Sequence, residues 1–268
     1  MASLGRALSL EWKAVPLRTN ADVAEAVARG DVEMGALPVE NTLAGSVTAS
    51  YDALIETDEI IVVHETVLPI HHCLMAPPSA TLATLVTVES HPVALAQCTV
   101  FFGRHPWLRQ QASFDTAGAA REVGDSGDSR RGAIAARVAA ERYGLTILAE
   151  NIEDRPDNQT RFLAFVKRGS SASEIASRTL ARSATHQRTI LAITTENAPG
   201  ALFRALEPFA NRGLNLVKIE SRPTGEPWTY RFILDVEGDA APAIDELRTR
   251  TAWCRVIGTY ARDAALRY

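Results

Sequence analysis

GALFRALEPFANRGLNLVKIESRP, residues 200–223, is the stretch that determines the fold of the C-terminal part of the chain. It follows Pro199, carries a helical pattern to Asn211 and has a strand pattern at 214–220. The sequence on either side adds strands at 189–195 and 229–236, a helix at 242–250 and a strand at 254–259. The order βαββαβ predicts a ferredoxin-like domain.

A polar segment separates this domain from the rest of the chain. Residues 168–187, RGSSASEIASRTLARSATHQ, are rich in Ser, Ala and Arg and poor in bulky apolar side chains, which is typical of a tether. We therefore expect a first region at 1–168, a linker at 169–187 and the ferredoxin-like domain at 188–268. A chain of 268 residues can hold one divided region and one small domain.

The first region alternates short apolar strands with helical patterns from Val15 to Val166, which predicts an α/β fold with a largely parallel sheet. Asn20 is expected to cap a helix at 21–29 that ends at Gly30. Val32, Met34 and Ala36 then alternate as in a strand. Further strands are predicted at 60–67, 85–88, 132–135 and 161–166.

The composition excludes several classes of protein. Apolar residues make up 46% and charged residues 22%, as in ordinary globular domains. The net charge is −4 and Lys and Arg do not cluster, so we expect no nucleic acid partner. No apolar run approaches the length of a membrane span, and the N-terminus lacks the apolar core of a secretion signal. These features predict a soluble, cytoplasmic protein.

The spacing of cysteine and histidine predicts no metal site. Cys73, Cys98 and Cys254 are far apart and form no CxxC pair, which suits buried thiols in a reducing compartment without disulfides or zinc. His71 and His72 are adjacent in an apolar segment, so in a strand they point to opposite faces. We expect structural roles for them and for His64 and His105, and we expect no cofactor.

Three polar clusters in the first region each follow an apolar strand and open a helix. They are Glu40-Asn41-Thr42 with Gly45-Ser46-Val47, Ser90-His91-Pro92, and Asp115-Thr116-Ala117. Each offers capping side chains and free backbone N–H groups, and strand ends of this kind meet at one edge of an α/β sheet. Together they can hold a small dianion, although a plain capping role explains each cluster taken alone.

Two further segments offer charged or hydroxyl groups. Asn158-Gln159-Thr160-Arg161-Phe162 places a hydroxyl beside a guanidinium at the start of a strand, where the alternative is an exposed arginine without function. In the distal domain, the segment 200–202 opens a helix, and Asn215 and the segment 220–223 bracket the next strand. These groups can dock the carboxylate of a zwitterion, and a simple turn with a hairpin is the alternative.

Several of these strings together resemble the prephenate dehydratase family from Val15 to the end of the chain. The strings are GALPVENTLAGSV (35–47), ESHPVALAQC (89–98), DTAGAA (115–120), GAIAARVAAERYGL (132–145) and NQTRFLAFV (158–166). The distal string at 200–223 is similar to the regulatory ACT domain fused to this enzyme, in which such GAL and ESRP segments surround bound phenylalanine.

The resemblance implies a fold and a reaction. The first region is expected to form two α/β lobes similar to type II periplasmic binding proteins, with the second lobe at about 72–155 and the active site in the cleft between the lobes. The reaction is expected to convert prephenate to phenylpyruvate with loss of water and carbon dioxide. Phenylalanine is the expected allosteric effector, and a homodimer or homotetramer is the expected assembly.

The resemblance also implies roles for individual residues. Thr160 corresponds to the family's catalytic threonine, Arg161 is expected to orient the strand or clamp a substrate carboxylate, and Glu40 is expected to orient donors or help in proton transfer. The expected substrate-binding residues are Asn41, Thr42, Gly45, Ser90, His91, Thr116, Ala117 and Phe162. The expected effector-binding residues are Gly200, Ala201, Leu202, Asn215, Glu220, Ser221, Arg222 and Pro223.

The chain departs from the family pattern in two places. Thr42 stands where the family usually has serine, which keeps the hydroxyl but restricts its rotamers. The family normally begins with a strand, a Gly-Pro-x-Gly-Thr-like turn and a helix, whereas this chain has MASLGRALSLEWKA, in which residues 5–9 are the expected remnant of the turn. We therefore expect the first lobe to lack a central strand.

Three alternatives stay open at this point. An arogenate dehydratase would act on the amino counterpart of prephenate, and a non-catalytic phenylalanine sensor would keep only the binding. A relative that decarboxylates prephenate and keeps its hydroxyl fits less well, because Thr160 is present and such relatives typically lack the ACT domain.

Overall fold

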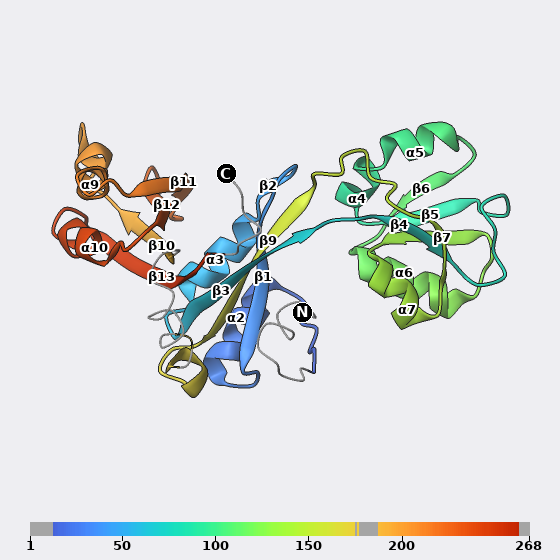
Figure 1. Cartoon of the computed structure of the whole chain (residues 1–268), viewed down its shortest axis with the longest axis horizontal. Helices are drawn as coiled ribbons and strands as arrows, with labels where there is room; N and C mark the ends of the chain where they lie inside the picture. Colours follow the sequence, from blue (N-terminus) through green and yellow to red (C-terminus); the bar gives the residue numbers. More distant parts are fainter. Residues whose placement is uncertain (1–12, 175, 177–186, 263–268) are drawn as a thin grey trace. The chain divides into compact units, whose positions relative to one another are not determined.

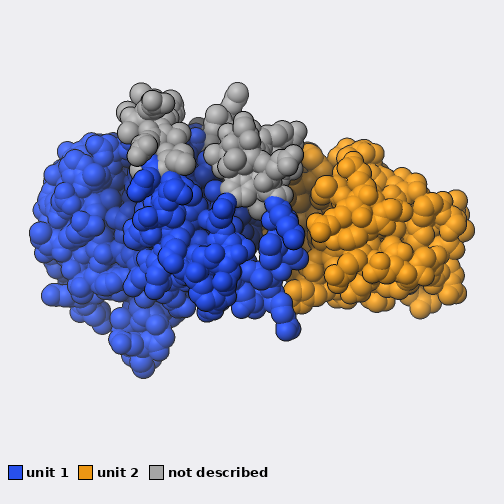
Figure 2. Space-filling model, turned by 90° about the horizontal axis from the view of Figure 1, so that it is seen from below, with its two compact units in different colours: residues 1–40, 46–67, 161–268 blue, residues 41–45, 68–160 orange. Residues whose placement is uncertain are grey.

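The computed structural model describes residues 13–174, 176 and 187–262, and the chain forms two compact units (Figure 2). Unit 1 comprises residues 1–40, 46–67 and 161–268, and unit 2 comprises residues 41–45 and 68–160. The chain therefore passes from one unit to the other after Glu40, Gly45, Val67 and Thr160. The expected turn remnant at 5–9 and most of the expected linker lie outside the described residues, and the predicted domain boundaries stay predictions.

The first part of unit 1 holds two helices against a set of strands (Figure 1). In chain order the elements are α2 (Asn20–Arg29), β1 (Met34–Asn41), β2 (Gly45–Ser46), α3 (Thr48–Glu56), β3 (Ile60–Pro69) and β9 (Gln159–Lys167). The prediction that Asn20 caps α2 is wrong, because the hydroxyl of Thr19 accepts the backbone N–H of Asp22. The helix does end at Gly30, whose φ of 83° is a left-handed cap.

The strand predicted around Met34 is confirmed as β1, but its buried face is the opposite one. Gly35, Leu37 and Val39 are buried, whereas Met34 and Ala36 are only partly so. Leu37 and Val39 join a core with residues of α3, β3 and β9. An alternating pattern shows that a strand is present, and tertiary packing decides which face it buries.

The distal part of unit 1 has the predicted βαββαβ order. Its elements are β10 (Gln187–Thr194), α9 (Ala201–Ala210), β11 (Asn215–Pro223), β12 (Tyr230–Glu237), α10 (Ala241–Arg248) and β13 (Trp253–Ala261). Strand β10 lies between β12 and β13, antiparallel to both, and β12 pairs antiparallel with β11. Leu191 and Ile193 face a core with α9 and α10, while Ile190 and Ala192 belong to the same core as residues of α3.

One sheet runs through the whole of unit 1, in the strand order β11-β12-β10-β13-β3-β9-β1-β2. Strands β13 and β3 join its two halves in parallel, with Gly258 opposite Val62. A Cβ atom at Gly258 would lie 2.3 Å from the backbone oxygen of Val62, so this close approach requires glycine. The distal strands and the strands of the first region therefore form one continuous structure.

Unit 2 holds a five-stranded sheet in the order β6-β5-β7-β4-β8. Its elements are β4 (Cys73–Ala76), β5 (Thr87–Ser90), α4 (Pro92–Ala96), α5 (Thr99–Arg104), β6 (Arg109–Ala112), α6 (Thr116–Ser126), β7 (Arg131–Ala135), α7 (Arg137–Tyr143) and β8 (Thr146–Ala149). The prediction of a largely parallel sheet is wrong here, because β4 is antiparallel to β7 and β8, and only β5 pairs in parallel, with β6 and β7.

Helices cover both faces of the unit 2 sheet. Leu74 and Ala76 of β4 pack in a core with residues of α4 and α5, whereas Cys73 and Met75 pack with residues of α6 and α7. His71 and His72 precede β4 and do not lie in a strand, contrary to the prediction. Within the described ranges, we find no helix with the length and hydropathy of a membrane span.

Candidate active site

Asn41 and Thr160 come from distant parts of the chain and meet in unit 2. The side-chain amide of Asn41 donates to the hydroxyl of Thr160 at 2.9 Å and to the side-chain oxygen of Asn158 at 2.8 Å. Its own oxygen accepts the backbone N–H groups of Leu43 and Ala44, at 3.0 and 2.9 Å. Asn41 is therefore fixed at both ends of its amide, and it in turn fixes the Thr160 hydroxyl.

The Thr160 hydroxyl keeps its hydrogen for another partner. Its side chain is largely buried at 8% exposure, and among the described residues the only hydrogen bond of this hydroxyl is the one that it accepts from Asn41. A hydroxyl that accepts one bond and still carries a free hydrogen is a directed donor. Thr160 can therefore donate to a ligand oxygen.

A chain of buried polar groups supports this pair from behind. Asn158 is fully buried and donates to the side-chain oxygen of Gln97 at 3.1 Å, and the same oxygen lies 2.9 Å from Nε2 of His72. The backbone oxygen of Asn158 accepts the N–H of Ile70 at 2.8 Å. Such a satisfied network holds its members in one arrangement.

Thr42 and Gly45 complete the short segment that carries Asn41. The hydroxyl of Thr42 accepts the backbone N–H of Gln159 at 3.0 Å, and its backbone N–H donates to the oxygen of Gln159 at 3.0 Å. Gly45 is exposed with a φ of 79°, a conformation that favours glycine. Thr42 thus ties the segment 41–45 to the strand that carries Thr160.

The other predicted substrate residues of unit 2 gather at the carboxyl ends of β5 and β6. Ser90 is fully buried, and its hydroxyl donates to the backbone oxygen of Ile134 at 2.6 Å. His91 caps α4 with its ring nitrogen, and Thr116 and Ala117 open α6 behind the cap Asp115. The described contacts include no hydrogen bond between these residues and the Asn41–Thr160 pair. Their roles in binding stay predictions.

Arg161, next to Thr160 in the chain, is buried in unit 1 among charged groups. Its Nε donates to Glu65 at 2.8 Å, one terminal nitrogen donates to the Tyr260 hydroxyl at 2.8 Å, and the other lies 2.6 Å from Asp235. Burial opposes the charge, but Tyr260, Asp235 and Glu65 raise the pKa of Arg161 above its usual value. These contacts favour an anchoring role for Arg161 over a clamp on substrate.

Glu40 and Phe162 flank the same strands. The Glu40 carboxylate is 38% exposed and lies 3.8 Å from Arg161 and 3.5 Å from Nζ of Lys218. Phe162 is half-buried. No described contact assigns a chemical step to either residue, so both roles stay predictions.

The predicted effector residues lie at the start of α9 and on β11, one of the two edge strands of the unit 1 sheet. Gly200 has a φ of 75° and precedes α9, whose first residues Ala201 and Leu202 are half-buried. Asn215 begins β11 and Pro223 ends it, with Ser221 exposed between them. In the ferredoxin-like fold, helix α9 is antiparallel to strand β11. The start of α9 and the end of β11 therefore lie toward the same end of the domain.

Three of these residues already have side-chain partners within unit 1. Asn215 donates to Glu237 at 3.4 Å. Arg222 donates to Asp52 of α3 at 2.8 Å. Glu220 accepts the hydroxyl of Ser46 at 2.6 Å and lies 3.0 Å from Nζ of Lys218. Burial opposes ionisation, but these two partners lower the pKa of Glu220 below its usual value.

Two family models match the chain, and between them they cover most of it. The model of prephenate dehydratase matches residues 3–170, and the model of the ACT domain matches residues 189–243. The first match alone takes in the Asn41–Thr160 pair and covers more than half of the chain.

The chain belongs to the prephenate dehydratase family.

Curated members of the prephenate dehydratase family align along most of the chain. The bifunctional chorismate mutase/prephenate dehydratase of Aquifex aeolicus is 37% identical, with 92% of this chain and 66% of that protein covered. Arogenate dehydratase 2 of Petunia hybrida is 34% identical, with 95% and 67% covered. The prephenate dehydratase of Methanocaldococcus jannaschii is 34% identical, with 85% and 80% covered. The chain thus spans about two thirds of the length of the first two relatives.

Two solved structures share the fold over nearly the whole chain. The prephenate dehydratase of Arthrobacter aurescens in complex with L-Phe has a TM-score of 0.82 at 32% identity, with 92% of this chain and 81% of that chain covered. GqqA, described as a novel type of quorum quenching acylase, has a TM-score of 0.83 at 32% identity, with 97% and 93% covered. The predicted fold class, a two-lobed α/β catalytic region with a ferredoxin-like ACT domain, is confirmed.

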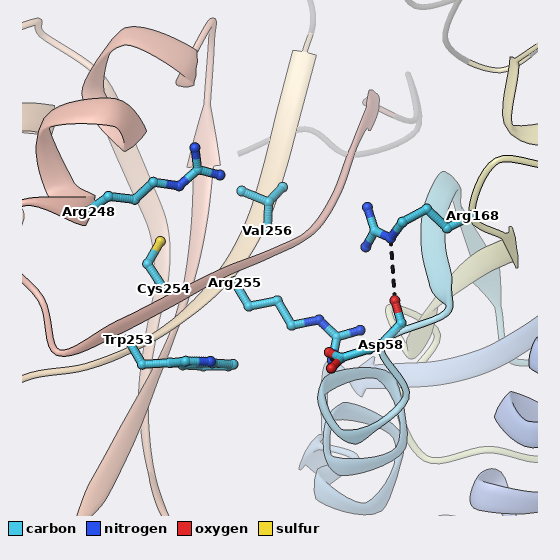
Figure 3. Close-up of a pocket in the computed structure, with 7 residues that line it drawn as sticks. All are labelled: Asp58, Arg168, Arg248, Trp253, Cys254, Arg255 and Val256. Carbon is cyan, nitrogen blue, oxygen red and sulfur yellow. Dashed lines mark hydrogen bonds and ion pairs between the residues drawn. The ribbon is translucent and has the colours of Figure 1, made fainter.

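A hollow of about 370 Å³ in unit 1 contains none of the predicted prephenate dehydratase site residues (Figure 3). It is lined by Asp58, Arg168, Arg248, Trp253, Cys254, Arg255 and Val256. Arg255 donates to the backbone oxygens of Ile55 and Thr57 and pairs with Asp58. Burial lowers its pKa, in spite of Asp58. The donors of the Arg255 guanidinium thus already have acceptors within the protein. We assign the hollow no function.

The structure gives supporting roles to residues to which the sequence pattern assigned none. Asn158 and Gln97 support the Asn41–Thr160 pair, and Asp235 and Tyr260 hold Arg161. One signal was available for Asp235, because a carboxylate stands inside the apolar strand pattern FILDV at 232–236. Gln97 had no such signal.

Proposed function

We propose that this chain converts prephenate to phenylpyruvate, carbon dioxide and water, and that L-phenylalanine bound by its ACT domain lowers the turnover. The observation that carries the proposal is the Thr160 hydroxyl, which accepts a hydrogen bond from Asn41 and keeps its own hydrogen for a ligand. Membership of the prephenate dehydratase family supplies the substrate class.

The reaction needs a hydrogen-bond donor at the leaving oxygen. The bond between the ring and its carboxylate breaks, its electron pair enters the ring as the ring becomes aromatic, and the ring C–O bond breaks. The departing hydroxide takes up one proton from the solvent to become water. Thr160 donates a hydrogen bond to that oxygen as negative charge develops on it, which is the preorganised stabilisation typical of such sites. The hydroxyl is too weakly acidic to ionise freely, so positioning rather than full proton transfer is its role.

The effector and the assembly belong to the same proposal. The ACT model match and the relative solved with L-Phe support phenylalanine as effector, bound by the segments 200–202 and 220–223.

Phe203 and Ile219 of the distal domain are exposed at 73% and 49%. Exposed apolar groups beside an edge strand suit association with a second copy, so we propose a homodimer or homotetramer. The buried free thiols of Cys73 and Cys98 support a cytoplasmic location.

Product analysis on the purified chain tests the proposed reaction. Prephenate and arogenate are supplied separately, with and without phenylalanine, and the products are separated by chromatography. Phenylpyruvate formed from prephenate and suppressed by phenylalanine is the expected result. Phenylalanine formed faster from arogenate would make the chain an arogenate dehydratase, the activity that the Petunia relative is named for. A folded chain that binds phenylalanine and turns over neither compound would be a sensor.

Acylase activity is a second candidate, because the likeness to GqqA covers 97% of this chain. The same preparation is incubated with an N-acyl amide, and the release of free fatty acid is followed. Release that Thr160→Ala leaves unchanged would indicate a separate site.

A further inference from the structure

Lys218 of β11 contacts four groups at once in unit 1. Its Nζ donates to the Ser46 hydroxyl at 2.6 Å and lies 3.0 Å from the Glu220 carboxylate. The same nitrogen lies 3.5 Å from the Glu40 carboxylate and 5.2 Å from the centre of the Tyr51 ring. The Lys218 side chain is only 12% exposed, so these contacts replace most of its hydration.

Two of these partners flank the segment that carries Asn41. Glu40 directly precedes Asn41, and Ser46 directly follows Gly45, so Lys218 contacts the residue on either side of 41–45. Within that segment the Asn41 oxygen accepts the N–H groups of Leu43 and Ala44, which makes it a closed turn. A displacement of its ends is therefore passed to Asn41 and, through the 2.9 Å bond, to the Thr160 hydroxyl.

The third partner belongs to the expected effector site. One oxygen of Glu220 accepts from Ser46 at 2.6 Å and lies 3.0 Å from Lys218. An ammonium group that binds Glu220 competes with Lys218 and Ser46 for this carboxylate. Binding of an amino acid at the effector site then changes the contacts of Lys218 with Glu40 and Ser46, the residues on either side of 41–45.

We propose that Lys218 is the positioning residue that couples an amino-acid effector at Glu220 to the Asn41–Thr160 pair. The inference rests on the proposed function, because it assigns a route to that regulation. Coupling of this kind is reciprocal, so substrate must change the affinity for phenylalanine by the same factor by which phenylalanine changes the affinity for substrate.

The test measures the coupling factor, which is the ratio of the dissociation constants of phenylalanine with and without a saturating, unreactive prephenate analogue. We expect a factor of about 5–150 in the native chain, the usual range for allosteric proteins. Lys218→Met and Ser46→Ala should each bring the factor close to one, and Lys218→Arg should restore part of it. Lys167→Met is the matched control, since Lys167 is exposed at the end of β9, and it should keep the native factor.

The outcomes separate the two proposals. A native factor retained in both Lys218→Met and Ser46→Ala would overturn the coupling role, whatever their thermal stability. A native chain that forms no phenylpyruvate or binds no phenylalanine would instead overturn the proposed function, and the coupling role would fall with it. A loss of stability alone does not move the factor, because both dissociation constants are measured on the folded protein.

Discussion

Two neighbouring residues of β9 have opposite environments. The Thr160 hydroxyl accepts from Asn41 in unit 2, whereas the Arg161 guanidinium is buried in unit 1 against Glu65, Asp235 and Tyr260. Thr160 and Arg161 are consecutive in the strand, so their side chains point to opposite faces. Arg161 therefore anchors its own part of β9 in unit 1.

Replacement of Arg161 by methionine should destabilise the protein. Its side chain is 5% exposed, and the carboxylates of Glu65 and Asp235 are fully buried. Removal of one member of such a buried charge cluster typically costs about 3–5 kcal/mol, because buried charge is left less compensated. We expect Arg161→Met to lower the free energy of unfolding by that amount in urea titrations. Arg130→Met is the control, since Arg130 is 72% exposed and its surface pairing with Asp128 contributes little to stability.

A clamp on the substrate carboxylate would behave differently. In that case Arg161→Met would raise KM strongly and leave the free energy of unfolding near that of the native chain. That result would contradict the anchoring role.

The sequence showed the site residues singly but not their pairing. Asn41 and Thr160 stand in recognisable strings, yet 119 residues separate them and no local pattern predicts their hydrogen bond. The partners of Arg161 come from four other strands, β1, β3, β12 and β13. Such contacts follow from the order of strands in the sheet, which alternation along one strand does not contain.

At the scale of elements, Asp154 holds the start of the short helix α5. Its carboxylate accepts the backbone N–H of Thr99 at 2.9 Å, the Thr99 hydroxyl at 2.5 Å and the backbone N–H of Val100 at 2.9 Å. Burial opposes the effect, but these donors lower the pKa of Asp154 below its usual value. A distant loop thus caps a helix that has no side-chain cap of its own.

Asp154→Ala should lower the free energy of unfolding by about 1–2 kcal/mol at pH 7, the usual cost of a lost helix cap with its charge. A carboxyl whose folded pKa is depressed contributes stability above its unfolded pKa, about 3.9 for aspartate, and loses it as the pH falls through the folded pKa. The difference between native chain and variant should therefore shrink in urea titrations from pH 7 to pH 3. An equal difference at both pH values would contradict this account, and Asp125→Asn, which changes an exposed residue of α6, serves as the control.

Elements were predicted well where the pattern is local. The six elements of the ACT domain were found because each has its own period and the turns between them are short. The orientation of β4 was not predictable, since parallel and antiparallel strands have the same alternation and only their partners distinguish them. The cap of α2 was misplaced by one residue because Thr19 and Asn20 are both good caps.

On the scale of the whole molecule, the main finding in unit 1 is that the ACT strands continue the catalytic sheet. The sequence predicted a tethered domain, and the parallel pairing of β13 with β3 was not predictable because nothing near Gly258 or Val62 points to the other. The proposed regulation would pass through these packed strands and the contacts of Lys218.

Gly258→Ala tests whether this junction holds the unit together. The new Cβ atom would lie 2.3 Å from the Val62 oxygen, so β13 and β3 would have to separate, and overpacking of this kind costs about 1–3 kcal/mol or more. A lower thermal midpoint is the expected result. Gly103→Ala is the matched control, because nothing lies within 4 Å of a Cβ there and alanine in a helix is neutral or stabilising. Equal midpoints for the two variants would argue against the junction.

The most direct test of the central claim is the kcat for phenylpyruvate formation by Thr160→Ala and Thr160→Ser, measured beside the native chain. The claim is that a hydroxyl at this position, oriented by Asn41, stabilises the departing oxygen. We predict a fall in kcat of about 10²–10³ for alanine, the usual cost of one preorganised donor, and only a small fall for serine, which keeps the hydroxyl. A folded Thr160→Ala variant with the native kcat would contradict the account.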